Sequence, residues 1–474
     1  MKQLESTKRI VVLLSGLIEL ILQTGVYAWF WYHVFYPLLS MPRVSTEGYA
    51  LGNGLKFYFW GHVLVIAIYF VLMLFFSNTY GGLKIGYLKP LDVFFSQIFS
   101  LIMVNVISYF QLSLMRNWLV PAKPFLEILG LELVLSFIWT YISNAVYKAM
   151  FPPREMLLIS GEHPIDDILH KFSTRSDRYH ISRCMNITEG IEAIKAECTQ
   201  RYGAVVLWDI PTQQRNQLLK FCYSRSIRVY LMPKIPDVLV KGADQMHLFD
   251  TPILLIREYS IKIEQRAIKR MIDIVFSLLM IIITSPIMLV TAIIIKCYDG
   301  GPILYKQVRC TMDQKEFKIM KFRSMRVDAE KDGVARLAAR NDSRITPIGK
   351  FIRSCRIDEL PQLFNILSGD MSFIGPRPER PEIIRQYMED MPEFAYRMKV
   401  KAGLAGYAQV YGKYNTTPYD KLKLDLTYIQ NYSVWLDIKL MLLTLKILFT
   451  PESTEGVEEN QITAMKEEKD QEER

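Results

Sequence analysis

Residues that bind metals and carry redox chemistry are scarce in this sequence. It has six cysteines and six histidines among 474 residues. The cysteines form no Cys-x-x-Cys pair and have no histidine at metal-binding spacing: Cys184, Cys198, Cys222, Cys297, Cys310 and Cys355. This pattern argues against a Cys/His metal centre and predicts reduced thiols in a cytosolic environment. We interpret Cys355 as a packing residue.

Glycine is also scarce where a dinucleotide cofactor would require it. Residues 151–258 contain short apolar runs at 156–160, 204–208 and 229–232, separated by helical segments. That alternation predicts a Rossmann-like cytosolic α/β domain with a parallel sheet. The first run ends in Ser160-Gly-Glu-His163, with one glycine where the dinucleotide fingerprint has three. We therefore expect no bound NAD, and a role in packing, assembly or regulation.

Long apolar runs, in contrast, are abundant. Hydrophobic residues make up 50% of the chain. Four runs near the N-terminus reach the length of about 20 residues that a membrane-spanning helix needs: 10–36, 55–76, 91–115 and 125–147. The first is too long for a signal peptide, lacks a small-residue cleavage site and is followed by three more, so we expect an anchor that is not removed. Residues 1–150 are thus predicted to form a bundle of four transmembrane helices.

The charges that flank these runs indicate their orientation. The more basic side carries Lys2, Lys8, Arg9, Lys84, Lys89, Lys148 and Arg154, and the other side carries Arg43, Lys56, Arg116 and Lys123. The more basic side is expected in the cytoplasm, which also holds the chain that follows. Glu19, Glu127 and Glu132 lie within or near the runs. No basic partner or relay pattern accompanies these acids, so we expect them to pair between helices or to lie near an interface.

Two adjacent carboxyls, Asp358 and Glu359, open the segment with the strongest functional pattern. The apolar residues that follow have the spacing of a helix with one buried face: Leu360, Leu363, Phe364 and Leu367. Pro361 fits only the first turn, so the helix is predicted to start near Asp358. The helix dipole would lower the pKa of a carboxyl there and keep it ionised, as a nucleophile or metal ligand must be. An acidic N-cap beside a surface loop is the simpler alternative.

The surroundings of the two acids favour a functional site. Many cations lie within about forty residues upstream, a density that points to an anionic ligand: Lys318, Lys321, Arg323, Arg340, Arg344, Lys350, Arg353 and Arg356. Downstream, Ser368-Gly369 predicts the end of the helix. Arg377 follows between two prolines, on a restricted backbone that suits fork-like binding of phosphate.

At these residues the chain resembles a known family, the bacterial sugar transferases. The shared motifs stand in the family's order and spacing: Lys321-Phe-Arg-Ser-Met325, Asp342-Ser-Arg-Ile-Thr346 with Gly349, Asp358-Glu-Leu-Pro-Gln362, Gly369-Asp-Met-Ser-Phe-Ile-Gly-Pro-Arg-Pro378 and Gly406-Tyr-Ala-Gln409. The resemblance covers about Ala267 to Phe449. It is closest to the long-form monotopic phosphoglycosyl transferases, which are polyprenyl-phosphate hexose-1-phosphate transferases. The first half of the chain is similar to them in layout only.

The resemblance implies a reaction with a covalent intermediate. Asp358 would attack the β-phosphate of a UDP-hexose and release UMP, and undecaprenyl phosphate would then accept the phospho-sugar. This step initiates exopolysaccharide, capsule or O-antigen synthesis. The expected partners are UDP-hexose, undecaprenyl phosphate and membrane lipids, without nucleic acid, and a homodimer is left open. The expected location is the bacterial inner membrane, with the catalytic domain on the cytoplasmic face.

The resemblance also assigns roles to individual residues. Glu359 would support Asp358 through metal binding or proton handling, since neighbours on a regular helix lie about 100° apart. Mg²⁺ would be held by Asp358, Glu359 and Asp425. The substrate-binding residues would be Lys321, Arg323, Arg353, Arg377, Gln409, Lys413 and Asp437. None of the six histidines falls in the matched motifs, so histidine supplies no catalytic base.

Residues 267–296 form an apolar segment of a different kind. It has Arg266 before it, Lys296 at its end and Ser285-Pro286 inside it. Proline in a helix removes a backbone hydrogen bond and bends the helix. The segment is long enough to cross a membrane, but a fifth crossing would place Asp358 away from cytosolic nucleotide sugars. We therefore expect a re-entrant helix bent at Pro286, as the resemblance also implies.

The C-terminal part departs from the family pattern in two places. Lys401-Ala-Gly-Leu-Ala-Gly406 stands where the family typically has Pro-Gly-Ile-Thr-Gly, and Lys413 stands where an arginine usually follows the glycine. Residues 435–449 have an apolar face that fits a helix in the membrane interface or an ordinary core helix. The domains are thus predicted as a transmembrane bundle (1–150), an α/β domain (151–258), a re-entrant helix with a mainly helical catalytic domain (259–450) and a disordered acidic tail (451–474).

Two other classes of function stay open. An inverting glycosyltransferase would release UDP instead of UMP, and it would be expected to carry an Asp-x-Asp metal motif that this sequence lacks. A non-catalytic membrane scaffold would not need the intact acid pair.

Overall fold

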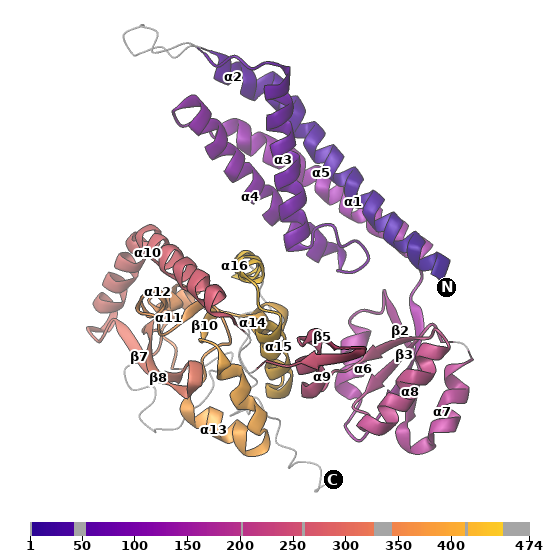
Figure 1. The fold of residues 1–474 in the computed structure, drawn as a ribbon. Helices are drawn as coiled ribbons and strands as arrows, with labels where there is room; N and C mark the ends of the chain where they lie inside the picture. The colour runs from indigo at the N-terminus through magenta and orange to yellow at the C-terminus, as the bar shows by residue number, and fades with distance from the viewer. Residues whose placement is uncertain are drawn as a thin grey trace, which may run out of the picture. The chain divides into compact units, whose positions relative to one another are not determined.

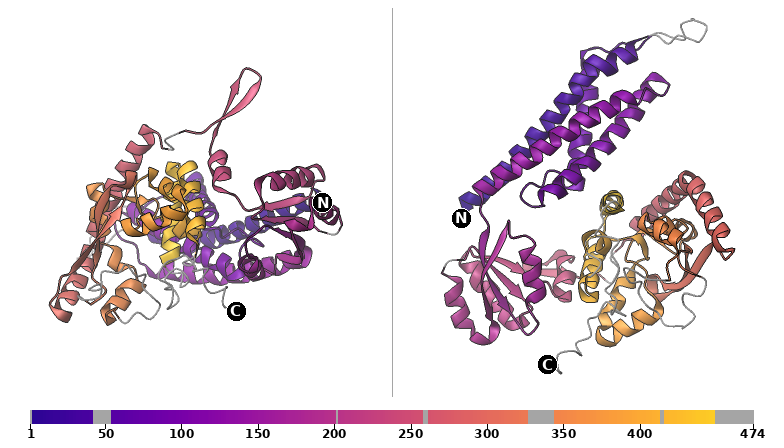
Figure 2. Two further views of the ribbon diagram at one scale, coloured as in Figure 1. Left: turned by 90° about the horizontal axis from the view of Figure 1, so that it is seen from below. Right: turned by 180° about the vertical axis from the view of Figure 1, so that it is seen from behind.

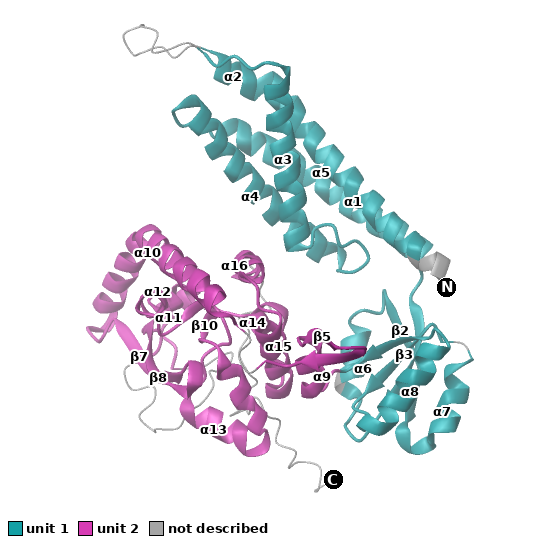
Figure 3. Ribbon diagram, viewed as in Figure 1, with its two compact units in different colours: residues 1–232 teal, residues 233–474 magenta. Residues whose placement is uncertain are grey.

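The computed structural model describes residues 2–41, 54–200, 202–257, 261–326, 344–412 and 416–448. The chain divides into two compact units, residues 1–232 and 233–474 (Figure 3). It is mostly helical, and within the described residues five helices are long and apolar enough to cross a membrane.

Four of these five helices lie in the first unit (Figure 1). Helix α1 (Lys2–Phe30) continues through a π-helical turn (Trp31–Phe35) into α2 (Tyr36–Ser40). The others are α3 (Phe59–Tyr80), α4 (Pro90–Arg116) and α5 (Lys123–Met150). The last three agree with the predicted runs to within four residues, whereas the first helix begins eight residues before its predicted run.

The buried acids of these helices share one polar cluster. Both carboxylate oxygens of Glu132 accept hydrogen bonds, from Tyr69 Oη and Asn105 Nδ2, each at 2.6 Å. Gln23 Nε2 donates to Glu19 Oε1 at 2.8 Å and to the Glu132 carbonyl at 3.2 Å. Pairing between helices is thereby confirmed for Glu132, whereas the Glu19 carboxyl accepts its hydrogen bond from Gln23 of its own helix. Glu127 is exposed instead, 3.8 Å from Lys123.

The first unit also contains a parallel four-stranded sheet in the order β2-β1-β3-β4. Strands β1 (Arg154–Ser160) and β3 (Ala204–Trp208) contain two of the predicted apolar runs, and β4 (Arg228–Leu231) contains the third except for its last residue. Helices α6 (Asp166–Ser173), α7 (Ile191–Cys198) and α8 (Thr212–Ser224) connect the strands, as in βαβ units. The fourth strand, β2 (Tyr179–Asn186), was not predicted because it is an edge strand with a largely polar, partly exposed sequence.

The second unit places small sheets among helices. Helix α9 (Ile235–Lys241) belongs to it, and its buried residues share a hydrophobic cluster with those of α15 (Pro418–Gln430). The other elements are β5 (Asp244–Leu248), β6 (Thr251–Leu255), α10 (Ile263–Asp299), β7 (Leu304–Cys310), β8 (Glu316–Phe322), α11 (Pro347–Ser354), α12 (Gln362–Ser368), β9 (Ser372–Ile374), α13 (Pro381–Asp390), β10 (Gly403–Ala405), α14 (Tyr407–Tyr411), α15 (Pro418–Gln430) and α16 (Val434–Leu448). In α16, Asp437, Leu440 and Leu443 are buried, whereas the predicted apolar face is only partly covered.

Helix α10 contains Pro286 and is drawn with a bend in Figures 1 and 2. Pro286 has no N–H for the Ile282 carbonyl, and Ser285 Oγ donates to that carbonyl at 2.8 Å. The hydroxyl thus replaces the lost backbone donor.

Both ends of α10 are fixed to the same globular core. Near its start, Asp273 Oδ1 accepts from Ser372 Oγ and from the Phe373 N–H, both at 3.0 Å. At its end, Asp299 forms an ion pair with Arg323. A straight helix of 37 residues would be about 55 Å long, so the bend is what allows both ends to reach one core.

The strongest anchor of α10 is a buried ion pair. Lys269 Nζ donates to Asp437 Oδ2 at 2.6 Å and to the Ile374 carbonyl at 2.8 Å. Tyr428 Oη donates to the other oxygen of Asp437 at 2.7 Å. The pair therefore joins α10, α15 and α16 in one network.

We expect Lys269→Met to destabilise the protein by about 3–5 kcal/mol, because it leaves the Asp437 carboxylate buried and unpaired. Adding Asp437→Leu should restore most of the loss. Thermal unfolding in detergent, followed by circular dichroism, would measure this, with exposed Lys262→Met as the control. Equal melting temperatures for Lys269→Met and wild type would contradict the buried pair.

Candidate active site

The two acids lie in a short 3₁₀ turn ahead of the predicted helix. This turn covers Ile357–Glu359, and α12 begins at Gln362 with Pro361 as its N-cap. The prediction that the helix starts near Asp358 was wrong by about one turn. Arg356, in the left-handed conformation (φ 52°), separates α11 from the 3₁₀ turn. Gly369, also left-handed, ends α12 as predicted.

The buried face of α12 also differs from the prediction. Leu363 is buried as expected, but Phe364 is exposed, and Asn365 and Ile366 are buried. Asn365 explains the rotation, since its side-chain amide completes the edge of strand β8. It accepts from the Met320 N–H at 2.9 Å and donates to the Lys318 carbonyl at 3.0 Å. This contact fixes the acid turn against β8, and hydrophobic spacing could not reveal it.

Glu359 collects the positive charge of the site. Its Oε1 accepts from Lys321 Nζ at 3.1 Å and from Arg377 Nη2 at 2.8 Å, and Arg356 lies 3.7 Å from Oε2. Burial acts to raise the pKa of Glu359, but these three cations hold it well below its usual value. Burial also lowers the pKa of Lys321. Glu359 is therefore an ionised anchor for two of the predicted phosphate-binding side chains.

Asp358 is in a different electrostatic state from its neighbour. It is buried, and its carboxyl forms no hydrogen bond or ion pair within the described part of the chain. Burial, followed by the charge of Glu359, raises the pKa of Asp358 to about 6, against the opposing effect of Lys321, Arg353 and Arg377. The predicted lowering of this pKa was wrong, because desolvation and a like charge outweigh the cations and the end of a helix that starts later. Asp358 is left available for chemistry.

The two other predicted phosphate-binding residues, Arg353 and Arg323, have different surroundings. Arg353, at the end of α11, is near enough for its charge to act on Asp358. Arg323 is buried and paired with Asp299, so it fastens the end of α10. Arg340 and Asp342 lie outside the described residues.

The predicted C-terminal site residues also have different surroundings. Gln409 lies in α14, and its buried Oε1 has no hydrogen-bond partner within the described residues. Asp437 is committed to Lys269 and Tyr428. Lys413 lies outside the described residues.

The three predicted Mg²⁺ ligands do not come together as a protein-only site. Asp425 is buried and bound by Arg397, with Nε and Nη2 at 2.9 and 2.8 Å from Oδ2. Glu359 is held by its cations, which leaves Asp358 alone among the three. No group of three His, Cys, Asp or Glu side chains suited to a metal occurs among the residues that the structure describes.

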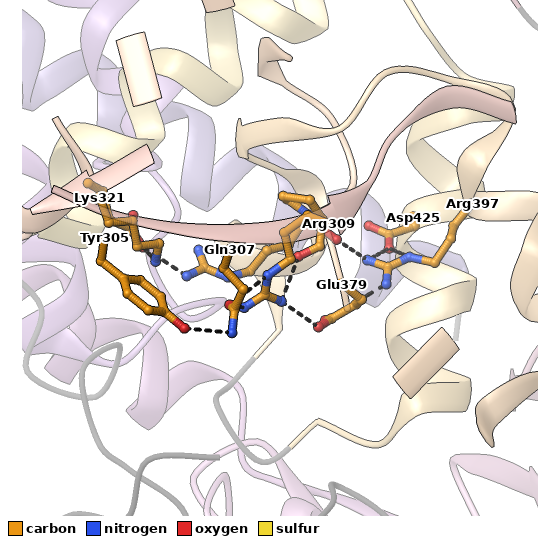
Figure 4. Close-up of polar contacts among 10 residues, drawn as sticks. Tyr305, Gln307, Arg309, Lys321, Glu379, Arg397 and Asp425 are labelled. Atoms are coloured by element: carbon orange, nitrogen blue, oxygen red, sulfur yellow. Dashed lines mark hydrogen bonds and ion pairs between the residues drawn. The ribbon is translucent and has the colours of Figure 1, made fainter. Parts of the chain in front are cut away.

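Sequence reasoning missed a set of contacts beside Arg377. Figure 4 shows Arg309, Glu379, Arg397 and Asp425 as a chain of polar contacts that also contains Gln307 and Tyr305. These residues come from β7, the loop after β9, the 3₁₀ segment Pro392–Lys399 and α15. Their wide separation in sequence leaves no local signal.

A buried carboxyl with a raised pKa beside a carboxyl held by cations, in a unit with a bent apolar helix, defines a site suited to anionic substrates at a membrane. Residues 264–451 match the model of the bacterial sugar transferase family. The chain is 37% identical over 190 residues to a UDP-glucose:undecaprenyl-phosphate glucose-1-phosphate transferase of Caulobacter vibrioides, covering 39% of this chain and 71% of that protein. The chain therefore belongs to the bacterial sugar transferase family.

Two further relatives extend the comparison. A UDP-N-acetylgalactosamine-undecaprenyl-phosphate N-acetylgalactosaminephosphotransferase of Aeromonas hydrophila is 37% identical over 256 residues, 53% of this chain and 60% of that protein. A UDP-glucose:undecaprenyl-phosphate glucose-1-phosphate transferase of Klebsiella pneumoniae is 41% identical over 210 residues, 43% of each chain. The chain thus matches about half the length of these two relatives.

We expect the step that the resemblance assigns to Asp358, release of UMP, to weaken as the pH falls through about 6. The carboxylate must be ionised to attack, so activity is present above this pKa and lost below it. UMP release without acceptor lipid, measured from pH 4.5 to 8, avoids titration of the lipid phosphate. Arg377→Gln should move the acidic limb upward, because a cation that lowers the pKa is removed. If UMP release were instead half lost at about pH 4, the ordinary pKa of an aspartate, the effect of burial on Asp358 would be contradicted.

Proposed function

We propose that this protein transfers hexose-1-phosphate from a UDP-hexose to undecaprenyl phosphate and releases UMP. The observation that carries the proposal is the unequal pair of acids. Asp358 is buried without an ion-pair partner in the described structure, beside Glu359 that holds Lys321 and Arg377. The activities for which the similar transferases are named support the same reaction class.

The proposed chemistry has two steps at one phosphorus atom. A carboxylate oxygen of Asp358 attacks the β-phosphorus of the UDP-hexose, and the bond from that phosphorus to the bridging oxygen breaks. UMP leaves with the bond electrons, and the phospho-sugar stays on Asp358. A phosphate oxygen of undecaprenyl phosphate then attacks the same phosphorus and displaces the carboxylate, which yields undecaprenyl diphosphate-hexose.

The cations have a defined part in this scheme. Lys321 and Arg377 are held by Glu359, so they do not have to be ordered when the diphosphate binds. Arg353 adds charge from the end of α11. These residues would neutralise the phosphate oxygens while Asp358 attacks.

We also propose that Mg²⁺ accompanies the diphosphate of the substrate. Mg²⁺ is usually bound through one or two carboxylates together with substrate phosphates. Of the predicted ligands only Asp358 has a carboxyl without an ion pair among the described residues, and Asp425 is withdrawn from the set by Arg397. When bound, the ion would supply charge neutralisation. Undiminished UMP release in excess EDTA would contradict this part of the proposal.

The proposed setting is the cytoplasmic face of a bacterial inner membrane. The four N-terminal helices would span it, the Rossmann-like domain would lie in the cytosol, and α10 would enter and return on the same side. Both ends of α10 are fixed to one core, which supports the re-entrant geometry. The product would start exopolysaccharide, capsule or O-antigen synthesis. The exposed hairpin of β5 and β6 offers a surface for a homodimer.

We expect Asp358→Asn to reduce UMP release by about a thousandfold or more while the protein stays folded, because it removes the nucleophile but almost preserves volume. Exposed Asp390→Asn is the matched control and should keep wild-type activity. Purified protein incubated with a panel of UDP-sugars and undecaprenyl phosphate, with UMP and UDP separated by chromatography, makes the measurement. Near-normal turnover of Asp358→Asn would refute the assignment, and UDP release would favour a glycosyltransferase.

The bent helix gives a second prediction, on topology. Single cysteines at exposed Glu264 and Lys306, in a background without native cysteines, should be labelled by an impermeant thiol reagent from the same side of oriented vesicles. Cys310 is unsuitable because it is buried. Pro286→Leu restores the helical N–H, so we expect opposite-side labelling to appear and UMP release to fall. Ile287→Leu keeps the proline and serves as control. If the two cysteines were labelled from opposite sides in the protein that keeps Pro286, the re-entrant geometry would be overturned.

A further inference from the structure

The loop that carries Arg377 is held by its carbonyl groups. Pro376 and Pro378 have no N–H, so only the carbonyl side of these residues can hydrogen-bond. Each carbonyl of residues 376–379 accepts a hydrogen bond: Pro376 from the Gly403 N–H at 2.9 Å, Arg377 from Arg397 Nη2 at 3.0 Å, Pro378 from Arg309 Nη1 at 3.2 Å and Glu379 from the Cys310 N–H at 3.1 Å. The two central contacts come from arginine side chains.

Arg397 is itself rigidly held. It is 4% exposed, and its guanidinium forms the ion pair with Asp425 of α15 described above. The same Nη2 that contacts Asp425 donates to the Arg377 carbonyl. Glu379 lies between the two arginines, 3.6 Å from Arg309 and 3.8 Å from Arg397 (Figure 4). The negative charges therefore fix both guanidinium groups beneath the loop.

The position of this support matters more than its strength. The carbonyl that Arg397 holds belongs to the residue whose side chain donates to Glu359. A planar fork can bind a carboxylate and a carbonyl at once, whereas a lysine ammonium lacks that fixed geometry. Loss of the fork would let the Arg377 backbone shift while the ion pair with Asp425 could persist.

We propose that Arg397 and Arg309 are positioning residues that act through Arg377 and set the affinity of the site for a nucleoside diphosphate. Asp425 serves this support by holding Arg397, in place of the metal-binding role that the resemblance implies. The inference rests on the proposed function, because it takes the diphosphate of a UDP-sugar as the anion that Arg377 meets.

A double-mutant cycle on the purified full-length protein tests the inference, with the dissociation constant for UDP as its readout. Arg377→Ala and Arg397→Lys should each weaken UDP binding about tenfold, and the double variant should be at most about twofold weaker than Arg377→Ala, because Arg397 acts through the missing side chain. Arg257→Lys, whose exposed partner is Asp244, is the control and should bind UDP like wild type.

The outcomes separate this inference from the proposed function. A double variant about a hundredfold weaker than wild type, as independent effects would give, overturns it, and so does wild-type binding by Arg397→Lys. If Arg397→Lys does not fold, Arg309→Lys enters the same cycle with the same criterion. The product of turnover, UMP or UDP, is measured separately with wild type and decides the proposed function. An unchanged dissociation constant for UDP in Arg377→Ala also overturns the inference.

Discussion

Unequal sharing of positive charge between two adjacent carboxyls is the interaction on which the site depends. Glu359 is surrounded by Lys321, Arg356 and Arg377, so it stays ionised although it is buried. Asp358 has no ion-pair partner among the residues that the structure describes, and burial together with the adjacent charge of Glu359 keeps its pKa high. Had the cations been placed evenly, both groups would be stable ion pairs and neither would be free to react. The pair thus combines an anchor and a reactive group in two consecutive residues.

The rest of the second unit maintains this inequality by fixing the backbone on either side of it. Asn365 attaches α12 to β8 and sets the distance from the acids to Lys321. Arg270 caps the other end of α12, donating to the Ile366 and Leu367 carbonyls at 2.7 and 2.8 Å. Since Arg270 lies in α10, the apolar helix and the acid turn belong to one rigid arrangement. The site and its membrane-directed helix are therefore mechanically connected.

The sequence predicted well those features that depend on local patterns. Apolar runs located β1, β3, β4 and the long helices, and Gly369 located the end of α12. Local patterns failed where the partner is distant in the chain. Lys269 and Asp437 are 168 residues apart, so nothing in the sequence near Asp437 indicates its buried ion-pair partner.

The same limit applies at the candidate site. The resemblance assigned Asp425 to the metal, and no local pattern could reveal its ion-pair partner Arg397, which is 28 residues away. The pKa of Asp358 was misjudged because a helix end is visible in sequence whereas desolvation is not. The polar edge strand β2 has no apolar signature, since only its pairing with β1 makes it a strand. Residue types were read correctly at these places, but their partners could not be.

The bend in α10 has a consequence for the lipid around the protein. In the proposed topology both arms enter from the cytoplasmic face and return to it, so they displace lipid from one leaflet only. The helices of the first unit would cross the bilayer in the same topology and would displace lipid from both leaflets. One chain would then occupy more area in the cytoplasmic leaflet than in the opposite leaflet. Segments inserted in this way respond to membrane curvature and lipid composition. The bend at Ser285 and Pro286 would therefore favour membrane regions of particular curvature or lipid composition.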